Sequence, residues 1–115
     1  MKVVYIGEKG IGRDESNIIF AFEDYDSTER PPIPRKIKHV ERHSPDGFEW
    51  GYGGSGPADT ALSILHDYFA LTDRDVSIID NIYHRFKFDI ILKQKEELKI
   101  FDTEIEEWLN EILEK

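Results

Sequence analysis

The chain contains no cysteine and only one methionine among its 115 residues. Without cysteine it can form no disulfide, thiolate nucleophile or zinc–thiolate site. No apolar run approaches the roughly 18–20 residues that a membrane-spanning helix requires. The N-terminal apolar stretch turns polar too early to serve as a signal peptide. We therefore expect a single cytoplasmic domain, residues 1–115, that does not associate with membranes and carries neither a cofactor nor a metal.

Positive charge is also scarce, with 15 Lys and Arg residues against 24 Asp and Glu residues and a formal net charge of −9. This balance disfavours general nucleic-acid binding. The exception is the segment 30–42, which holds five basic side chains against Glu41 alone. The C-terminal segment 102–114 is acidic. Its carboxylates could present a nucleic-acid-like surface to a basic partner, or form the solvated side of an amphipathic helix.

Hydrophobic periodicity predicts strands first and helices afterwards. The expected strands are 3–6, 18–22, 36–43 and 48–52, with a short strand at 98–101. The expected helices are one that begins near Pro57, one over 80–93 and a final one capped by Asp102 or Thr103. For 86–92 a strand competes with the helix. We predict an α+β fold: a small antiparallel sheet of about four to five strands, with two or three helices packed on one face.

The segment 51–56 places four glycines in six positions directly before the first predicted helix. One interpretation is a structural corner, since glycine allows a sharp turn from strand to helix. The other is an anion cradle, because N–H groups at a helix N-terminus lack partners within the helix. The P-loop motif does not fit, and the dinucleotide motif fits loosely without its parallel βαβ setting. Asp59 would in addition repel a phosphate. Both interpretations stay open.

Several side chains near this segment could complete a ligand site. Trp50 and Tyr52 could stack on a base, and Arg42 and Lys87 could supply charge. His43 enters the turn that precedes the aromatic residues and could approach the loop. The candidate ligand-binding residues are therefore Gly51, Tyr52, Gly53, Gly54, Ser55, Gly56, His43, Trp50, Arg42 and Lys87.

Catalytic equipment is sparse. The chain lacks the His-Glu-x-x-His motif and the Gly-x-Ser-x-Gly nucleophile elbow. A hydrolase built around His43, Ser55, Asp59 and His66 is the weakest of the functional hypotheses. The sequence favours a protein without catalytic activity.

The run His43-Ser44-Pro45-x-Gly47-Phe48-x-Trp50-Gly51-Tyr52-Gly53-Gly54-Ser55-Gly56-Pro57-Ala58 resembles a small uncharacterised family of bacteria and their phages, a domain of unknown function. Looser similarities are Tyr5-x-Gly7, Arg30-Pro31-x-x-Pro34, Tyr83-x-x-Phe86-Lys87 and Ile105-x-x-Trp108-Leu109. The resemblance implies no established activity. It implies phage-associated biology, in which small acidic proteins often inhibit host proteins, and it marks His43, the glycines and Lys87 as positions to test.

Two functions follow as hypotheses. The first is a small non-catalytic binding protein, phage-associated, that inhibits a host defence or regulatory protein through a protein–protein contact. The alternative is a binder of a nucleotide or other phosphate ligand that sequesters a signalling nucleotide through Gly51–Gly56. The sequence alone does not identify the partner, and it does not indicate the oligomeric state.

Overall fold

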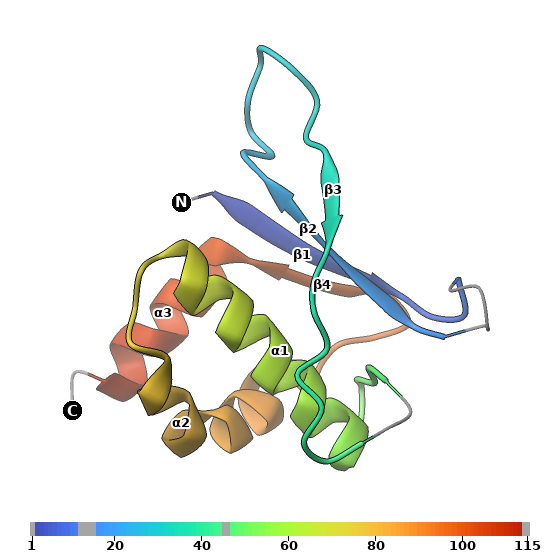
Figure 1. Ribbon diagram of the computed structural model, residues 1–115, viewed down its shortest axis with the longest axis vertical. Helices are drawn as coiled ribbons and strands as arrows, with labels where there is room; N and C mark the ends of the chain where they lie inside the picture. Colours follow the sequence, from blue (N-terminus) through green and yellow to red (C-terminus); the bar gives the residue numbers. More distant parts are fainter. Residues whose placement is uncertain (1, 12–15, 45–46, 114–115) are drawn as a thin grey trace.

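The computed structural model describes residues 2–11, 16–44 and 47–113, and its elements confirm an α+β fold (Figure 1). Pro45 of the glycine-loop motif therefore lies outside the described residues. In chain order the elements are β1 (Val3–Glu8), β2 (Ile18–Glu23), β3 (Pro34–Lys36), α1 (Ser55–Leu71), the 3-10 helix η1 (Val76–Ile78), α2 (Ile79–Phe86), the π-helix η2 (Lys87–Ile91), β4 (Leu98–Phe101) and α3 (Asp102–Leu113).

The four strands form one antiparallel sheet in the order β3-β2-β1-β4. The predicted hairpin of the first two strands is confirmed, with Tyr5 opposite Ala21. Ile100 of β4 lies on the other side of Tyr5. All three side chains are fully buried, so the side of the sheet on which they lie faces the core.

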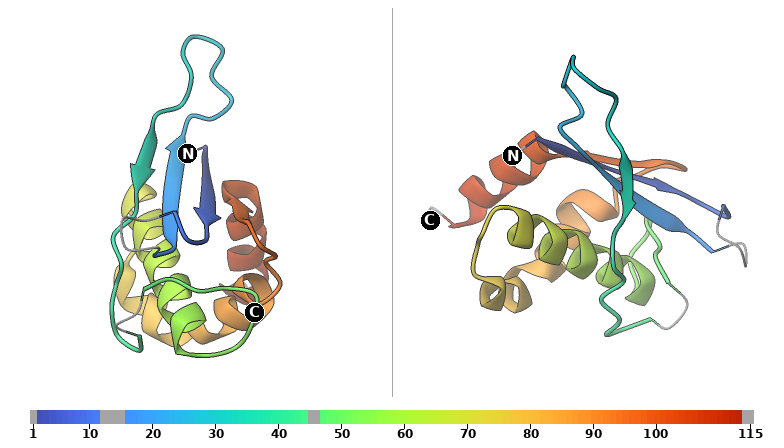
Figure 2. Two further views of the ribbon diagram at one scale, coloured as in Figure 1. Left: turned by 90° about the vertical axis from the view of Figure 1, so that its right-hand side faces the viewer. Right: turned by 45° about the horizontal axis from the view of Figure 1, so that its top comes forward.

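The helices lie on one side of the sheet, as predicted, and leave the other side uncovered (Figures 1 and 2). The buried apolar face of α1 follows the predicted stripe, which comprises Ala58, Ala61, Leu62, Leu65, Tyr68 and Phe69. A charged network ties α1 to the helices and strands around it. The carboxylate of Asp67 accepts hydrogen bonds from Tyr5 and Arg35, and Glu106 of α3 accepts from Tyr68 and Arg74.

The predicted strands over 36–43 and 48–52 are wrong beyond Lys36. Both segments run along α1 as irregular chain, because side chains of that helix take over their backbone hydrogen bonds. The N–H of Val40 donates to Ser63 Oγ (2.8 Å), and the N–H of Glu49 donates to Thr60 Oγ1 (3.0 Å). The alternating apolar residues of these segments reflect contact with a helix and not pairing within a sheet.

The segment 80–93 is helical up to Ile91, which excludes the competing strand over 86–92. Its second half, Lys87–Ile91, is a π-helix, a local widening that is frequent at functional sites. The short strand at 98–101 is confirmed as β4. α3 begins at Asp102, whose carboxylate accepts hydrogen bonds from the Val3 N–H and the Tyr25 hydroxyl.

Both edges of the sheet are short. On β4 the N–H groups of Lys99 and Phe101 donate to side chains, namely Gln94 Oε1 (2.9 Å) and Glu104 Oε1 (3.2 Å). Such capping leaves fewer donors for a further strand. The connection between β2 and β3, residues 24–33, projects from the body of the protein (Figures 1 and 2). We call these residues the arm.

Candidate functional site

The glycine loop leads directly into α1. Gly54 precedes the first helical residue and offers no side chain to cap the helix, and the helix starts without a carboxylate in its first turn. Gly51 has a left-handed backbone (φ 88°), which favours glycine, and its N–H donates to the Ile91 carbonyl (3.2 Å). The loop is thus attached to the end of η2.

Close packing explains two of the four glycines. A Cβ on Gly56 would lie 2.8 Å from Cβ of Glu49, and one on Gly51 would lie 3.0 Å from the Gln94 carbonyl oxygen. A Cβ on Gly53 would make only ordinary van der Waals contacts, and one on Gly54 would lie 3.3 Å from the ring of Tyr52, which is the far end of a side chain. The structural corner accounts for Gly51 and Gly56, whereas packing does not require Gly53 and Gly54.

The two aromatic candidates have different positions. Trp50 is fully buried, and its Nε1 donates to the Lys95 carbonyl (2.8 Å), so its ring offers no free face to a ligand. Tyr52 is 50% exposed. Desolvation and the charge of Glu49 raise the pKa of the Tyr52 hydroxyl, which therefore stays protonated and can donate a hydrogen bond.

Phe88 of η2 joins Tyr52 on the surface and was missed by the sequence analysis. It is 54% exposed, and a Cβ on Gly53 would lie 3.8 Å from its ring. The signal was available, since Phe88 is apolar but falls outside the stripe of Ile79, Ile82, Tyr83, Phe86 and Ile90. Among the described residues, Tyr52 and Phe88 are the two aromatic side chains that are predominantly exposed. Gly53 adjoins Phe88, and Gly54 adjoins the Tyr52 ring.

A cluster of histidine, tyrosine and lysine continues this surface along α2. His43 Nε2 and the Tyr83 hydroxyl share a hydrogen bond of 2.8 Å. The His84 ring lies 5.8 Å from that of His43 and 4.1 Å from that of Tyr83. Desolvation, together with the charges of Lys87 and His43, lowers the pKa of His84.

Lys87 connects the two groups. Its Nζ lies 4.5 Å from the centre of the Phe88 ring, and its side chain is largely buried. No ion pair or hydrogen bond joins its ammonium to the described residues. We call the surface made of His43, Tyr52, Gly53, His84, Lys87 and Phe88 the loop–helix face.

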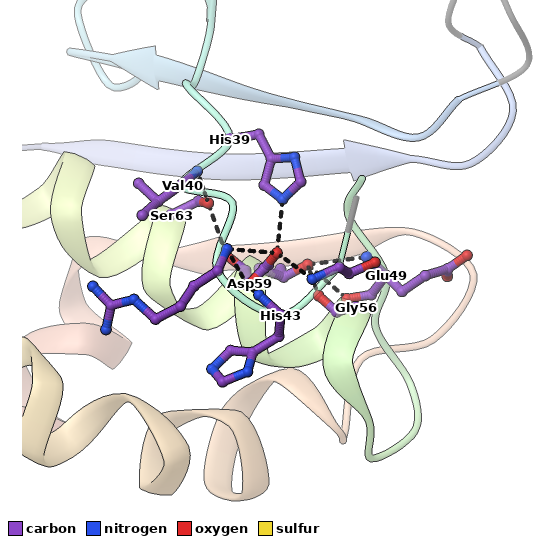
Figure 3. Close-up of polar contacts among 10 residues, drawn as sticks. His39, Val40, His43, Glu49, Gly56, Asp59 and Ser63 are labelled. Atoms are coloured by element: carbon purple, nitrogen blue, oxygen red, sulfur yellow. Dashed lines mark hydrogen bonds and ion pairs between the residues drawn. The ribbon is translucent and has the colours of Figure 1, made fainter. Parts of the chain in front are cut away.

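Asp59 fixes the chain that carries His43 (Figure 3). This fully buried carboxylate accepts hydrogen bonds from the N–H groups of Arg42, His43 and Ser44 and from the ring of His39. Desolvation raises the Asp59 pKa, but the hydrogen bonds outweigh it and hold the pKa below its ordinary value. Asp59 therefore holds the backbone next to the site in place from the interior, and it is not exposed to a ligand.

The remaining candidates are dispersed. Arg42 forms an ion pair with Asp80 (2.6 Å). Ser55 is exposed at the start of α1, and no hydrogen bond links it to a histidine in the described part of the chain. His66 buries its Nε2 without a partner there, and desolvation and Arg42 lower its pKa. The nucleophile and base of the hydrolase hypothesis are thus not joined.

Over residues 2–11, 16–44 and 47–113 there is no group of three or more His, Cys, Asp or Glu side chains arranged to hold a metal ion. Within the same residues, no helix has the length and apolar character needed to cross a membrane.

The comparisons with known proteins identify a family without an assigned function. No curated protein and no solved structure matches the chain. The profile of one family matches residues 5–111, which include the glycine loop, α2 and most of α3. The chain therefore belongs to the family of unknown function DUF6166.

Proposed function

We propose that the chain is a small non-catalytic binding protein that recognises a protein partner through the loop–helix face. The observation that carries the proposal is that Tyr52 and Phe88, each about half exposed, lie on the glycine loop and on η2, two segments that the Gly51–Ile91 hydrogen bond joins. Exposed aromatic side chains supply a large share of the binding energy at protein interfaces. They lose little conformational entropy when they are buried by a partner.

The charges beside these rings support the same proposal. Lys87 has a largely buried side chain, and its ammonium has no counter-ion in the described part of the chain. A carboxylate from a partner would supply one. His84, whose pKa is lowered by desolvation and by Lys87, would take up a proton more easily beside such a carboxylate. The face thus combines apolar anchors with a preference for acidic groups.

The resemblance noted in the sequence suggests a specific form of this function. A phage-associated protein acting in the cytoplasm would use such a face to block a host defence or regulatory protein. Nucleotide binding is the second candidate, and it is favoured by the glycine cap of α1, which leaves the first N–H groups without a side-chain partner. Against it, Glu49 packs on Gly56 and brings negative charge to that helix end.

Affinity capture tests the first function. The wild-type protein and a Tyr52→Ser/Phe88→Ser variant are immobilised, and the proteins that they retain from a bacterial lysate are quantified by mass spectrometry. We expect a partner that the wild type retains and the variant loses by more than tenfold, since truncating one interface hot spot costs about 2 kcal/mol or more.

The matched control is Ile33→Ser, which removes an apolar side chain that is 78% exposed on the arm. Capture should survive this change, and the thermal melts of all variants should stay close to that of the wild type. Equal capture by the wild type and the double variant would refute the role of the face. A rise in the melting temperature with nucleotides, abolished by Gly54→Val, would instead establish the second candidate.

A further inference from the structure

The uncovered side of the sheet is unusually apolar. The side chains of Tyr5, Ile19, Ala21 and Ile100 point into the core. The residues that alternate with them along each strand therefore point to the opposite side of the sheet. Antiparallel sheets that face water on one side usually carry polar residues there. Here the register instead forms the cross-strand rows Lys36-Phe20-Ile6-Lys99 and Pro34-Phe22-Val4-Phe101. We call these two rows the open sheet face.

Aromatic rings dominate this surface. The rings of Phe20 and Phe22 lie 6.5 Å apart on the inner strand β2, and both are partly exposed. Phe101 on β4 is also partly exposed and meets the Tyr25 ring edge-on at 5.5 Å. In the part of the chain that the structure describes, no helix covers this side of the sheet (Figure 2). The rings offer a platform on which a planar group can stack.

The charge of the open sheet face differs from that of the whole protein. Lys36 and Lys99 stand at its two edges, are exposed, and form no ion pair with a described residue. The Lys99 Nζ lies 5.7 Å from the centre of the Phe101 ring. Neither row contains a carboxylate. On a chain with a net charge of −9, the two rows therefore carry lysine as their charged residue, and Glu8, which follows Ile6 on the same side of β1, lies outside them at the end of the strand.

We propose that the open sheet face binds single-stranded nucleic acid, with Phe20, Phe22 and Phe101 stacking on bases. Lys36 and Lys99 would then contact phosphates on either side of the rings. Aromatic platforms flanked by cations bind single strands in this way, whereas a duplex hides its bases. The negative charge of the rest of the chain would confine the strand to this face.

A second copy of the chain is the competing occupant, and the charges disfavour it. Packing two open sheet faces together would bring four lysines into one interface without a carboxylate from either pair of rows. Like charges that face each other in an interface cost binding energy. A polyanion neutralises the same lysines.

Fluorescence anisotropy with labelled oligothymidylate, oligouridylate and a DNA duplex tests the proposal at about 50 mM salt. We expect the single strands to bind and the duplex to bind much more weakly. Phe20→Leu/Phe22→Leu keeps the apolar bulk but removes the rings, and it should weaken single-strand binding by at least tenfold. Lys36→Gln/Lys99→Gln should reduce the salt slope of log K by about 0.7 for each phosphate contact that is lost.

The matched controls are Val76→Ala and Lys93→Gln, which change an exposed apolar side chain and an exposed lysine outside both proposed surfaces. Their affinities should equal that of the wild type. Absence of single-strand binding at micromolar protein, equal loss in the controls, or no loss in either open-face variant would each overturn the proposal. So would sedimentation velocity that shows a dimer abolished by Phe20→Leu/Phe22→Leu. None of these outcomes touches the loop–helix face, so the protein-binding proposal is judged separately.

Discussion

Asp59 shows how one side chain replaces a neighbouring strand. Its carboxylate accepts hydrogen bonds from the three backbone N–H groups of residues 42–44. In a sheet, these N–H groups would donate to carbonyl groups of a neighbouring strand. The sequence presented Asp59 as an obstacle to phosphate near the glycine loop. The structure places it in the interior, where it holds His43 in position beside Tyr83.

Replacing Asp59 by asparagine should destabilise the protein by about 3 kcal/mol at neutral pH, because hydrogen bonds to a buried charge are strong and the new NH₂ group faces donors. Urea denaturation measures the loss. The control Asp73→Asn changes an exposed carboxylate at a left-handed position that asparagine also tolerates, and should have little effect. Similar losses in both variants would refute this role of Asp59.

The wild type and Asp59→Asn should also differ in how their stability responds to acid. Because the folded-state pKa of Asp59 lies below its ordinary value of about 3.9, its contribution is complete above about pH 4. That contribution is lost as the pH falls through the folded-state pKa. The stability difference between the wild type and Asp59→Asn should therefore shrink on acidification, as measured by urea denaturation across pH. A difference that does not change with pH would contradict the assignment.

At the scale of elements, the glycine loop divides into a packed part and an open part. Gly56→Ala should destabilise the protein by about 1–3 kcal/mol, because the new Cβ meets Cβ of Glu49, which sits next to the backbone and cannot swing away. Gly54→Ala should cost much less, since only the Tyr52 ring has to move. Thermal melts compare the two variants. The reverse order would show that the packing of Gly56 does not set the geometry of this corner.

The elements that the sequence predicted correctly either pair with a neighbour in the chain or show a regular spacing of apolar residues. The β1–β2 hairpin, the apolar stripe of α1 and the strand at 98–101 belong to this class. The errors at 37–43 and 48–52 have a different origin, since the backbone partners of Val40 and Glu49 are side chains of α1. Alternation of apolar residues cannot distinguish a strand from a chain laid along a helix.

The candidate site was predictable to a similar degree. The structure joins the segments that carry Tyr52, His43 and Lys87, because Gly51 donates to the Ile91 carbonyl and His43 shares a hydrogen bond with Tyr83. Their role in binding stays a prediction. Trp50 does not reach the loop–helix face, because its indole is fully buried and donates a hydrogen bond to the Lys95 carbonyl. Phe88 could have been found from the sequence, since it is apolar and lies outside the helical stripe, whereas the π-helix that carries it could not be predicted from a period of 3.6 residues.

At the scale of the whole molecule, the helical layer separates the two proposed surfaces. The open sheet face looks away from the helices, whereas the loop–helix face lies on α2, η2 and the glycine loop (Figure 1). A protein partner and a single strand could therefore be held at the same time. The chain would then act as an adaptor between them.

This arrangement predicts independent binding. Tyr52→Ser/Phe88→Ser should leave oligonucleotide affinity unchanged within about twofold, and Phe20→Leu/Phe22→Leu should leave partner capture unchanged, since distant sites that share no contacts behave additively. Anisotropy and affinity capture on the same variants provide the comparison. Competition between the partner and the oligonucleotide would show instead that the two surfaces are coupled.

The arm gives this cysteine-free chain a convenient attachment point. Thr28 is exposed on it, so Thr28→Cys would introduce the single thiol of the protein away from the helical layer. A fluorophore coupled there would report the distance to a labelled oligonucleotide and to a labelled partner in the same sample. The projecting connection between β2 and β3 thus becomes a common reference point from which the two ligands can be mapped.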